Sequence, residues 1–143
     1  MLGILLIGLV AGSIMLGITN IEKKLFEIRL KENAFEILRN YTNFIGSRIA
    51  LKDIADIRRG SEKDIAIYKH EDENNIVTDV YTAKISVEEL DAYCSKGCWD
   101  PEEETCHDLC YGKVFFLHTR IIWPNEADIQ DTLEFLTYQI ELR

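Results

Sequence analysis

The hydrophobic and polar positions of the chain follow two different periods, one before and one after about residue 60. Residues 1–18, MLGILLIGLVAGSIMLGI, contain no charged side chain, and residues 19–41 keep a helical spacing of apolar positions without a proline. This pattern predicts one continuous α-helix from residue 2 to residue 57, roughly 80 Å long at about 1.5 Å per residue. Gly46 is the position at which we expect that helix to be weakest.

The apolar positions in the second part of this helix lie on more than one side. Two adjacent stripes are formed by Ile21, Leu25, Ile28 and Phe35 and by Leu30, Ala34, Ile37, Leu38, Tyr41, Ile45 and Ile49. A small domain can cover only part of so long a rod. We therefore expect the remaining apolar surface to contact lipid or other protein chains.

After residue 60 the period becomes that of β-strands. Ile65 and Ile67 alternate with polar or small residues, residues 76–85 are rich in β-branched and aromatic side chains, and residues 115–123 alternate again. These three runs predict three strands that pair in an antiparallel sheet.

The C-terminal segment is ambiguous in period. Residues 132–142 fit either a helix or a strand, and we expect a short helix opened by Asn125, followed by an edge strand. The predicted fold class is α+β. A long N-terminal helix and stalk at 1–57 packs on a small antiparallel head at 58–143.

The first eighteen residues are nearly long enough, as a helix, to cross the hydrocarbon layer of a membrane. They reach roughly 27 Å as a helix, close to the hydrocarbon thickness of a bilayer. They lack the basic region and the small-residue cleavage site of a secretory signal. Gly8-x-x-x-Gly12 and Ser13-x-x-x-Gly17 are spacings that let two helices approach closely. The residues expected to contact membrane or neighbouring helices are Leu2, Leu5, Leu6, Gly8, Leu9, Gly12, Ile14, Leu16 and Ile18.

The four cysteines, Cys94, Cys98, Cys106 and Cys110, form the most specific local motif. Cysteines four residues apart share one face of a helix, and residues 86–89 (SVEE) resemble a capping box that would start the first of two short helices. Two antiparallel helices turned at residues 99–101 would bring Cys94 to Cys110 and Cys98 to Cys106, although four cysteines allow three pairings. We therefore expect a helical insert at 94–110 that is held by disulfides.

A structural zinc site is the competing interpretation of the same residues. It would use four thiolates, or His107 in place of one of them. Zinc sites usually have the shorter C-x2-C spacing, so disulfides are the preferred interpretation. A thiol-exchange enzyme would need a C-x-x-C pair, which the sequence lacks.

Two signals disagree on which side of a membrane the head lies. Disulfides place it outside the cytoplasm, whereas Lys23, Lys24, Arg29 and Lys31 after the apolar segment favour a cytoplasmic head. The disagreement disappears if a basic leader preceded residue 1 and was removed after insertion. Asn40, in Asn40-Tyr41-Thr42, is a candidate glycosylation site on an external stalk.

Charge and motifs exclude several function classes. The net charge is −9, and residues 71–131 carry fifteen acidic side chains, so we expect no nucleic-acid partner. No nucleophile, phosphate-loop or metalloprotease motif is present, and His70, His107 and His118 are isolated. We expect no catalytic activity, no cofactor and packing roles for Trp99 and Trp123.

The combination of an apolar N-terminal helix, its amphipathic continuation, an antiparallel sheet and a C-terminal cysteine region resembles type IV pilin-like subunits. The resemblance covers the whole architecture and rests on no specific motif. It implies a short leader removed by a prepilin peptidase, a methylated first residue at Met1, and a filament core built from residues 2–18. The family usually has a glutamate at the fifth mature position, where this chain has Leu5.

Two hypotheses follow. In the first, the chain is a structural subunit of a filament on the cell surface, a homo-oligomer assembled through residues 1–57 from a membrane-inserted precursor. In the second, it is a single-pass membrane protein whose disulfide-bonded head binds or adheres outside the cytoplasm.

Overall fold

The structure is a computed structural model of the chain. It describes residues 2–71, 77–94, 99–100, 105–106, 113–124 and 129–141; within these ranges, the side chains of 2–6, 71, 78, 79, 99, 100, 105 and 106 are not described. The described elements are one helix and six strands: α1 (Leu2–Ala50), β1 (Lys63–Glu71), β2 (Val77–Tyr93), β3 (Trp99–Asp100), β4 (Thr105–Cys106), β5 (Val114–Pro124) and β6 (Gln130–Ile140).

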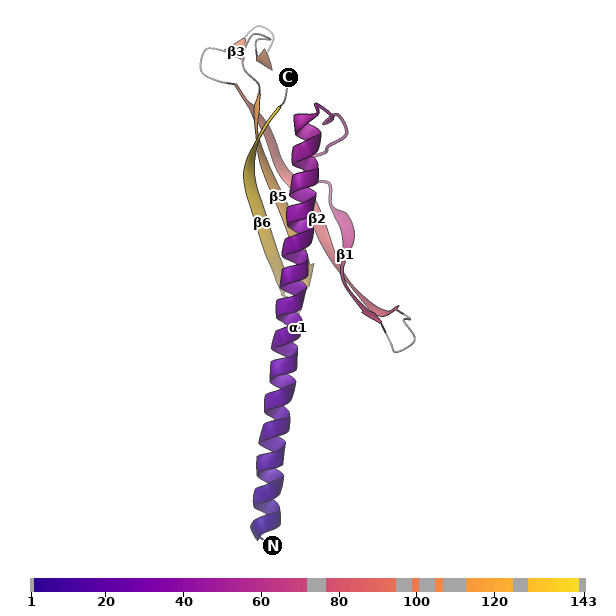
Figure 1. The fold of residues 1–143 in the computed structure, drawn as a ribbon, viewed down its shortest axis with the longest axis vertical. Coiled ribbons are helices and arrows are strands. Elements are labelled where there is room, and N and C mark those ends of the chain that lie inside the picture. Colours follow the sequence, from indigo (N-terminus) through magenta and orange to yellow (C-terminus); the bar gives the residue numbers. More distant parts are fainter. Residues whose placement is uncertain are drawn as a thin grey trace.

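Helix α1 lies along one face of a four-stranded antiparallel sheet (Figure 1). The strand order is β1-β2-β5-β6, so β1 and β6 are the two edges. The C-terminal part of α1 packs on the sheet, and its N-terminal part extends well beyond it. The predicted α+β class, with a long N-terminal helix on an antiparallel sheet, is confirmed.

The core lies between the second stripe of α1 and the alternating residues of the strands. Strand β5 shows the alternation most clearly, because every odd-numbered residue from Phe115 to Trp123 is buried and the residues between them are partly exposed. The buried apolar side chains are Leu30, Ala34, Leu38, Ile45, Ile49, Ile67, Ala83, Ile85, Val87, Phe115, Leu117, Ile121 and Trp123. The packing role predicted for Trp123 is confirmed.

Two threonines form the polar contact at the centre of this interface. The Thr42 hydroxyl on α1 donates to the Leu38 carbonyl at 2.8 Å and lies 2.6 Å from the Thr119 hydroxyl on β5. Since Thr42 donates to Leu38, Thr119 is the donor to Thr42. Both residues are buried, so this bond satisfies hydroxyls that water cannot reach.

We expect Thr42→Val to lower the free energy of unfolding by about 1–3 kcal/mol, because it leaves the buried Thr119 hydroxyl without its acceptor. The double variant Thr42→Val/Thr119→Val removes both hydroxyls and should recover most of that loss. Chemical denaturation of the three proteins measures this. A double variant less stable than Thr42→Val would contradict the assignment.

Helix α1 ends at Ala50, so the prediction that it continues to residue 57 is wrong. Lys52 has φ 62°, the Asp53 N–H donates to the Arg48 carbonyl at 2.9 Å and the Lys52 N–H donates to the Ile49 carbonyl at 3.1 Å. These bonds form a Schellman C-cap with Lys52 in the left-handed conformation. Gly46 does not interrupt the helix: a Cβ there would lie 3.0 Å from Gln139 Oε1, so the glycine lets β6 approach closely.

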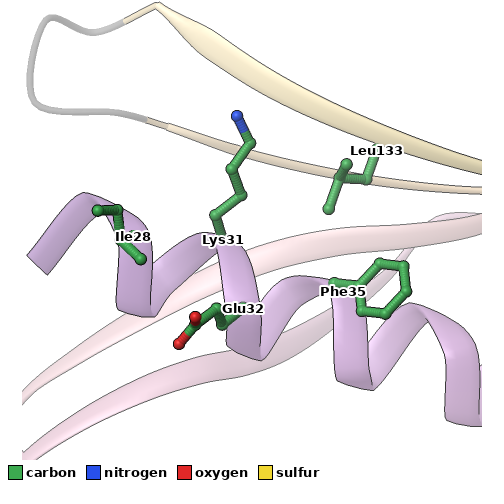
Figure 2. Close-up of a pocket in the computed structure, with 5 residues that line it drawn as sticks. All are labelled: Ile28, Lys31, Glu32, Phe35 and Leu133. Atoms are coloured by element: carbon green, nitrogen blue, oxygen red, sulfur yellow. The ribbon is translucent and has the colours of Figure 1, made fainter. Parts of the chain in front are cut away.

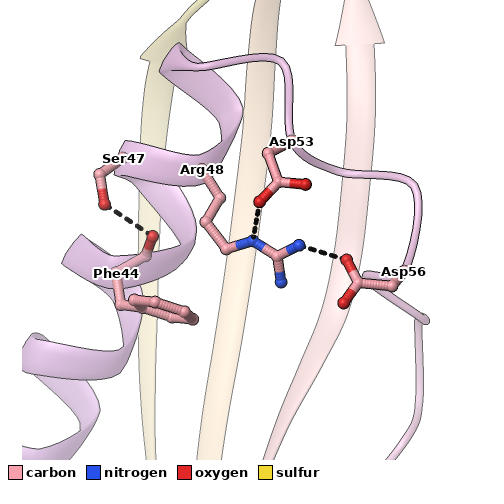
Figure 3. Close-up of polar contacts among 5 residues, drawn as sticks. All are labelled: Phe44, Ser47, Arg48, Asp53 and Asp56. Atoms are coloured by element: carbon pink, nitrogen blue, oxygen red, sulfur yellow. Dashed lines mark hydrogen bonds and ion pairs between the residues drawn. The ribbon is translucent and has the colours of Figure 1, made fainter.

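Arg48 fixes the loop that follows the helix (Figure 3). Its Nε donates to Asp53 at 3.1 Å, and its Nη2 donates to Asp56. The bond from Arg48 lowers the pKa of Asp56 and outweighs partial desolvation, which acts in the opposite direction. The Arg48 side chain thus joins the last turn of α1 to the loop that leads toward β1.

We expect Lys52→Gly to raise the free energy of unfolding by about 0.5–1 kcal/mol, because glycine adopts a positive φ without the steric cost of a Cβ. Lys52→Ala is the matched control: it loses the exposed contact between Lys52 Nζ and Glu141 at 3.6 Å but keeps the backbone strain. Thermal and denaturant unfolding compare the three proteins. Equal stability of Lys52→Gly and Lys52→Ala would contradict the role of φ.

Two further predictions from the sequence are wrong in part. Residues 86–89 do not start a helix, because they lie inside β2 and pair with β5, where burial of Val87 outweighs local capping propensity. Residues 99–101 were expected to turn between two helices, but Trp99–Asp100 pairs with Thr105–Cys106 as two short strands. In the C-terminal segment, residues 130–140 form one strand; the expected edge strand is confirmed, and no helix occurs within them.

Candidate assembly surface

The N-terminal part of α1 carries apolar side chains that no described residue covers. Over residues 7–28 every large apolar side chain except Phe26 is between 50% and 74% exposed. They are Ile7, Leu9, Val10, Ile14, Met15, Leu16, Ile18, Ile21, Leu25 and Ile28. We call this set the apolar rod. A helix that is hydrophobic all round is stable in water only when something else buries it.

The two hydroxyl groups along the apolar rod, those of Ser13 and Thr19, bond to the backbone of the same helix. The Ser13 hydroxyl donates to the Val10 carbonyl at 2.9 Å, and the Thr19 hydroxyl lies 3.0 Å from the Leu16 carbonyl and 3.2 Å from that of Met15. These hydroxyls therefore need no partner outside the helix. A covering surface can be apolar without leaving them unsatisfied.

The glycines of the rod leave room beside its backbone. A Cβ added at Gly8, Gly12 or Gly17 would meet no atom within 4 Å. Near them, Ile7, Val10, Ala11 and Ile14 line a shallow depression on the helix. Nothing in the folded chain requires glycine at these positions, whereas close contact with a second helix would.

The rod joins the head at an aromatic cluster. Phe26 on α1 contacts Tyr68 of β1 and Tyr81 of β2 edge-on, with ring centroids 5.2 and 5.0 Å apart. Among the described side chains of α1, Leu30 is the first that is buried. The head therefore holds the helix from about Phe26 onward and leaves the preceding turns uncovered.

An apolar recess lies at the other side of this junction, between α1 and the edge strand β6 (Figure 2). Ile28, Phe35 and Leu133 line it, and the side chains of Lys31 and Glu32 border it. Phe35 is 45% exposed although its ring lies 6.1 Å from that of Phe135. Phe35 belongs to an apolar stripe that is visible in the sequence, but the recess forms only because Leu133 reaches it from a strand distant in the chain.

The predicted assembly residues are distributed as follows. Gly8, Leu9, Gly12, Ile14, Leu16 and Ile18 are exposed on the apolar rod. Leu2, Leu5 and Leu6 belong to α1, and their side chains lie outside the described residues. In the described part of the chain, no helix is both long enough and apolar enough to cross a membrane.

The cysteine motif is described only at two points. Cys94 follows β2, Cys106 belongs to β4, and Cys98 and Cys110 lie outside the described residues. The pairing of the four cysteines, and the choice between disulfides and zinc, stay predictions. Over the residues that are described, no three His, Cys, Asp or Glu side chains converge as a metal site would require.

The remaining candidate residues lie apart from the rod. Asn40 is exposed on α1, but the hydroxyl of Thr42 in the same sequon is buried in the core, so glycosylation of Asn40 stays a prediction for the chain before folding. His118 lies on the face of β5 opposite the buried odd-numbered residues, with Nε2 3.4 Å from Glu134.

No family model matches the chain, and no curated protein and no solved structure matches it either.

Proposed function

We propose that the chain is a structural subunit of a filament of the type IV pilus class, located on the cell surface and assembled through α1. The observation that carries the proposal is the apolar rod, since a folded head that leaves ten large apolar side chains at least half exposed needs a partner for them. Copies of the same rod are a partner of matching chemistry, with no charged side chain over residues 7–21 and with glycines that allow close approach.

The arrangement of the head supports a filament more than an isolated anchor. The sheet covers one face of the C-terminal part of α1, whereas Phe35 and Phe44 on that same stretch are 45% and 56% exposed. Apolar surface thus continues along α1 beyond the length that a bilayer would cover. A bundle of parallel helices would bury both the rod and these phenylalanines, with the heads on the outside.

The second candidate is a membrane-anchored head that binds other molecules outside the cytoplasm. The same apolar rod favours it, because lipid would also cover these side chains. It leaves the glycine positions and the exposed Phe35 and Phe44 without a role. It also predicts that substitutions at the glycines change little.

We expect Gly12→Leu to reduce the amount of filament by at least roughly tenfold, because the added side chain keeps neighbouring helices apart. The same substitution should leave the head intact and raise the intrinsic helix propensity by about 1 kcal/mol, since no atom of the chain lies within 4 Å of the new Cβ. Asn43→Leu, at an exposed position beside the head, is the matched control. Electron microscopy and sedimentation of full-length protein after removal of detergent measure the outcome.

Intact mass spectrometry of filaments sheared from the surface of cells that produce the chain tests processing. A subunit that begins at Met1 with an added methyl group would support the pilin-like proposal. Protein found only in membranes, without filaments and unaffected by Gly12→Leu, would contradict it and favour the anchored head.

A further inference from the structure

Strand β6 presents a long and unprotected edge. It is eleven residues long, it pairs with β5 without a register shift, and no described strand pairs with its other side. Residues 130–140 contain no proline, lysine or arginine, which are the residues that usually prevent pairing at an exposed edge. Such an exposed edge either promotes aggregation or serves as a surface on which another strand pairs.

The direction of the unpaired backbone groups can be derived from one hydrogen bond. The Glu141 N–H donates to the Lys113 carbonyl at 2.9 Å. In a continuous antiparallel pair these bonds alternate, so the odd-numbered residues of β6 bond to β5 and the even-numbered ones, among them Thr132 and Leu136, face the open edge. The Ile140 carbonyl is consistent with this pattern. It accepts a hydrogen bond from the side-chain amide of Gln139 at 3.5 Å.

The opposite edge of the sheet, β1, differs from β6 in charge. It carries Lys63 and Lys69 together with Asp64 and Glu71, so it is close to neutral, whereas β6 carries Asp131 and Glu134 and no basic residue. A contact between two β6 edges would bring like charges together, whereas a contact between β6 and β1 offers Lys63 and Lys69 as partners for the acidic side chains. Register shifts begin after Ala66, so Lys63–Ala66 is the regular stretch of β1.

The topology makes this contact compatible with parallel helices. With four antiparallel strands in the order β1-β2-β5-β6, the two edge strands run in opposite directions. Two copies side by side in the same orientation therefore present β6 of one antiparallel to β1 of the next. An antiparallel pair of two β6 strands would instead reverse one copy and point its apolar rod the other way.

We propose that β6 of one subunit pairs with β1 of a neighbouring copy, which extends the sheet from head to head. This contact is heterologous, so it repeats without closing into a two-fold dimer. The apolar recess of Ile28, Phe35 and Leu133 lies next to the new seam and would be covered by the neighbouring head. The inference rests on the proposed filament, in which all apolar rods point the same way.

The first test blocks the edge without touching the β5 pairing. Thr132→Pro removes an N–H that faces the open edge, and Thr132→Val is the matched control, which keeps the N–H and nearly the same side-chain size. We expect Thr132→Pro to raise the critical concentration for filament formation by roughly tenfold and Thr132→Val to change it little. Circular dichroism and thermal unfolding of both variants report whether the head is still folded.

The second test does not depend on a proline variant. A photo-cross-linking amino acid at the exposed Thr132 in otherwise unaltered filaments should form a dimer whose linked peptide comes from residues 63–66 of the neighbour. Linkage to β6 of the neighbour, or no linkage in well-formed filaments, would overturn the pairing while the proposed function stands. If unaltered protein forms no filaments at all, the proposed function fails, and this inference fails with it.

Discussion

The contact between the C-terminal half of α1 and one face of the sheet is the constraint on which the rest of the structure depends. Leu30, Ala34 and Leu38 are almost completely buried against strands from the middle and the C-terminal part of the chain. The small Ala34 lets helix and sheet approach closely, and the Thr42–Thr119 bond satisfies the buried hydroxyls of the same interface. Since this contact covers only half of the helix, it also defines which half is left for other molecules.

The two halves of α1 have the same helical geometry, but they differ in their surroundings: one half packs on the sheet and the other is exposed. Beside the sheet, charged residues alternate with a buried stripe, so the helix is stable as part of a small domain in water. In the apolar rod, exposed Ile, Leu, Val and Met side chains surround the backbone. The hydrophobic effect therefore acts within one chain along the C-terminal half of α1, whereas the apolar rod leaves its apolar surface available to other molecules. Assembly through the rod and pairing through the sheet edges would use separate surfaces of one subunit.

Much of this architecture could be predicted from the sequence, because period and composition are local properties. The long helix, the antiparallel sheet and the burial of alternate residues in β5 follow from apolar spacing, and the exposure of the rod follows from its lack of charge. The errors occurred where tertiary contacts outweighed local propensity. The SVEE segment has a capping pattern, yet Val87 is buried in the core as part of β2. Lys52 ends the helix in a conformation that its residue type does not predict.

The sequence by itself determined that the protein has an apolar rod that must be buried, because no arrangement of so few polar groups can make residues 7–18 compatible with water. Only the tertiary structure decided where the head stops covering the helix, which strands form the edges and which backbone groups face outward. These properties depend on strand order and register, and they are set by contacts between residues that are far apart in the chain. The recess of Phe35 and Leu133 exists for the same reason: the helix and the edge strand meet there only after the sheet has formed.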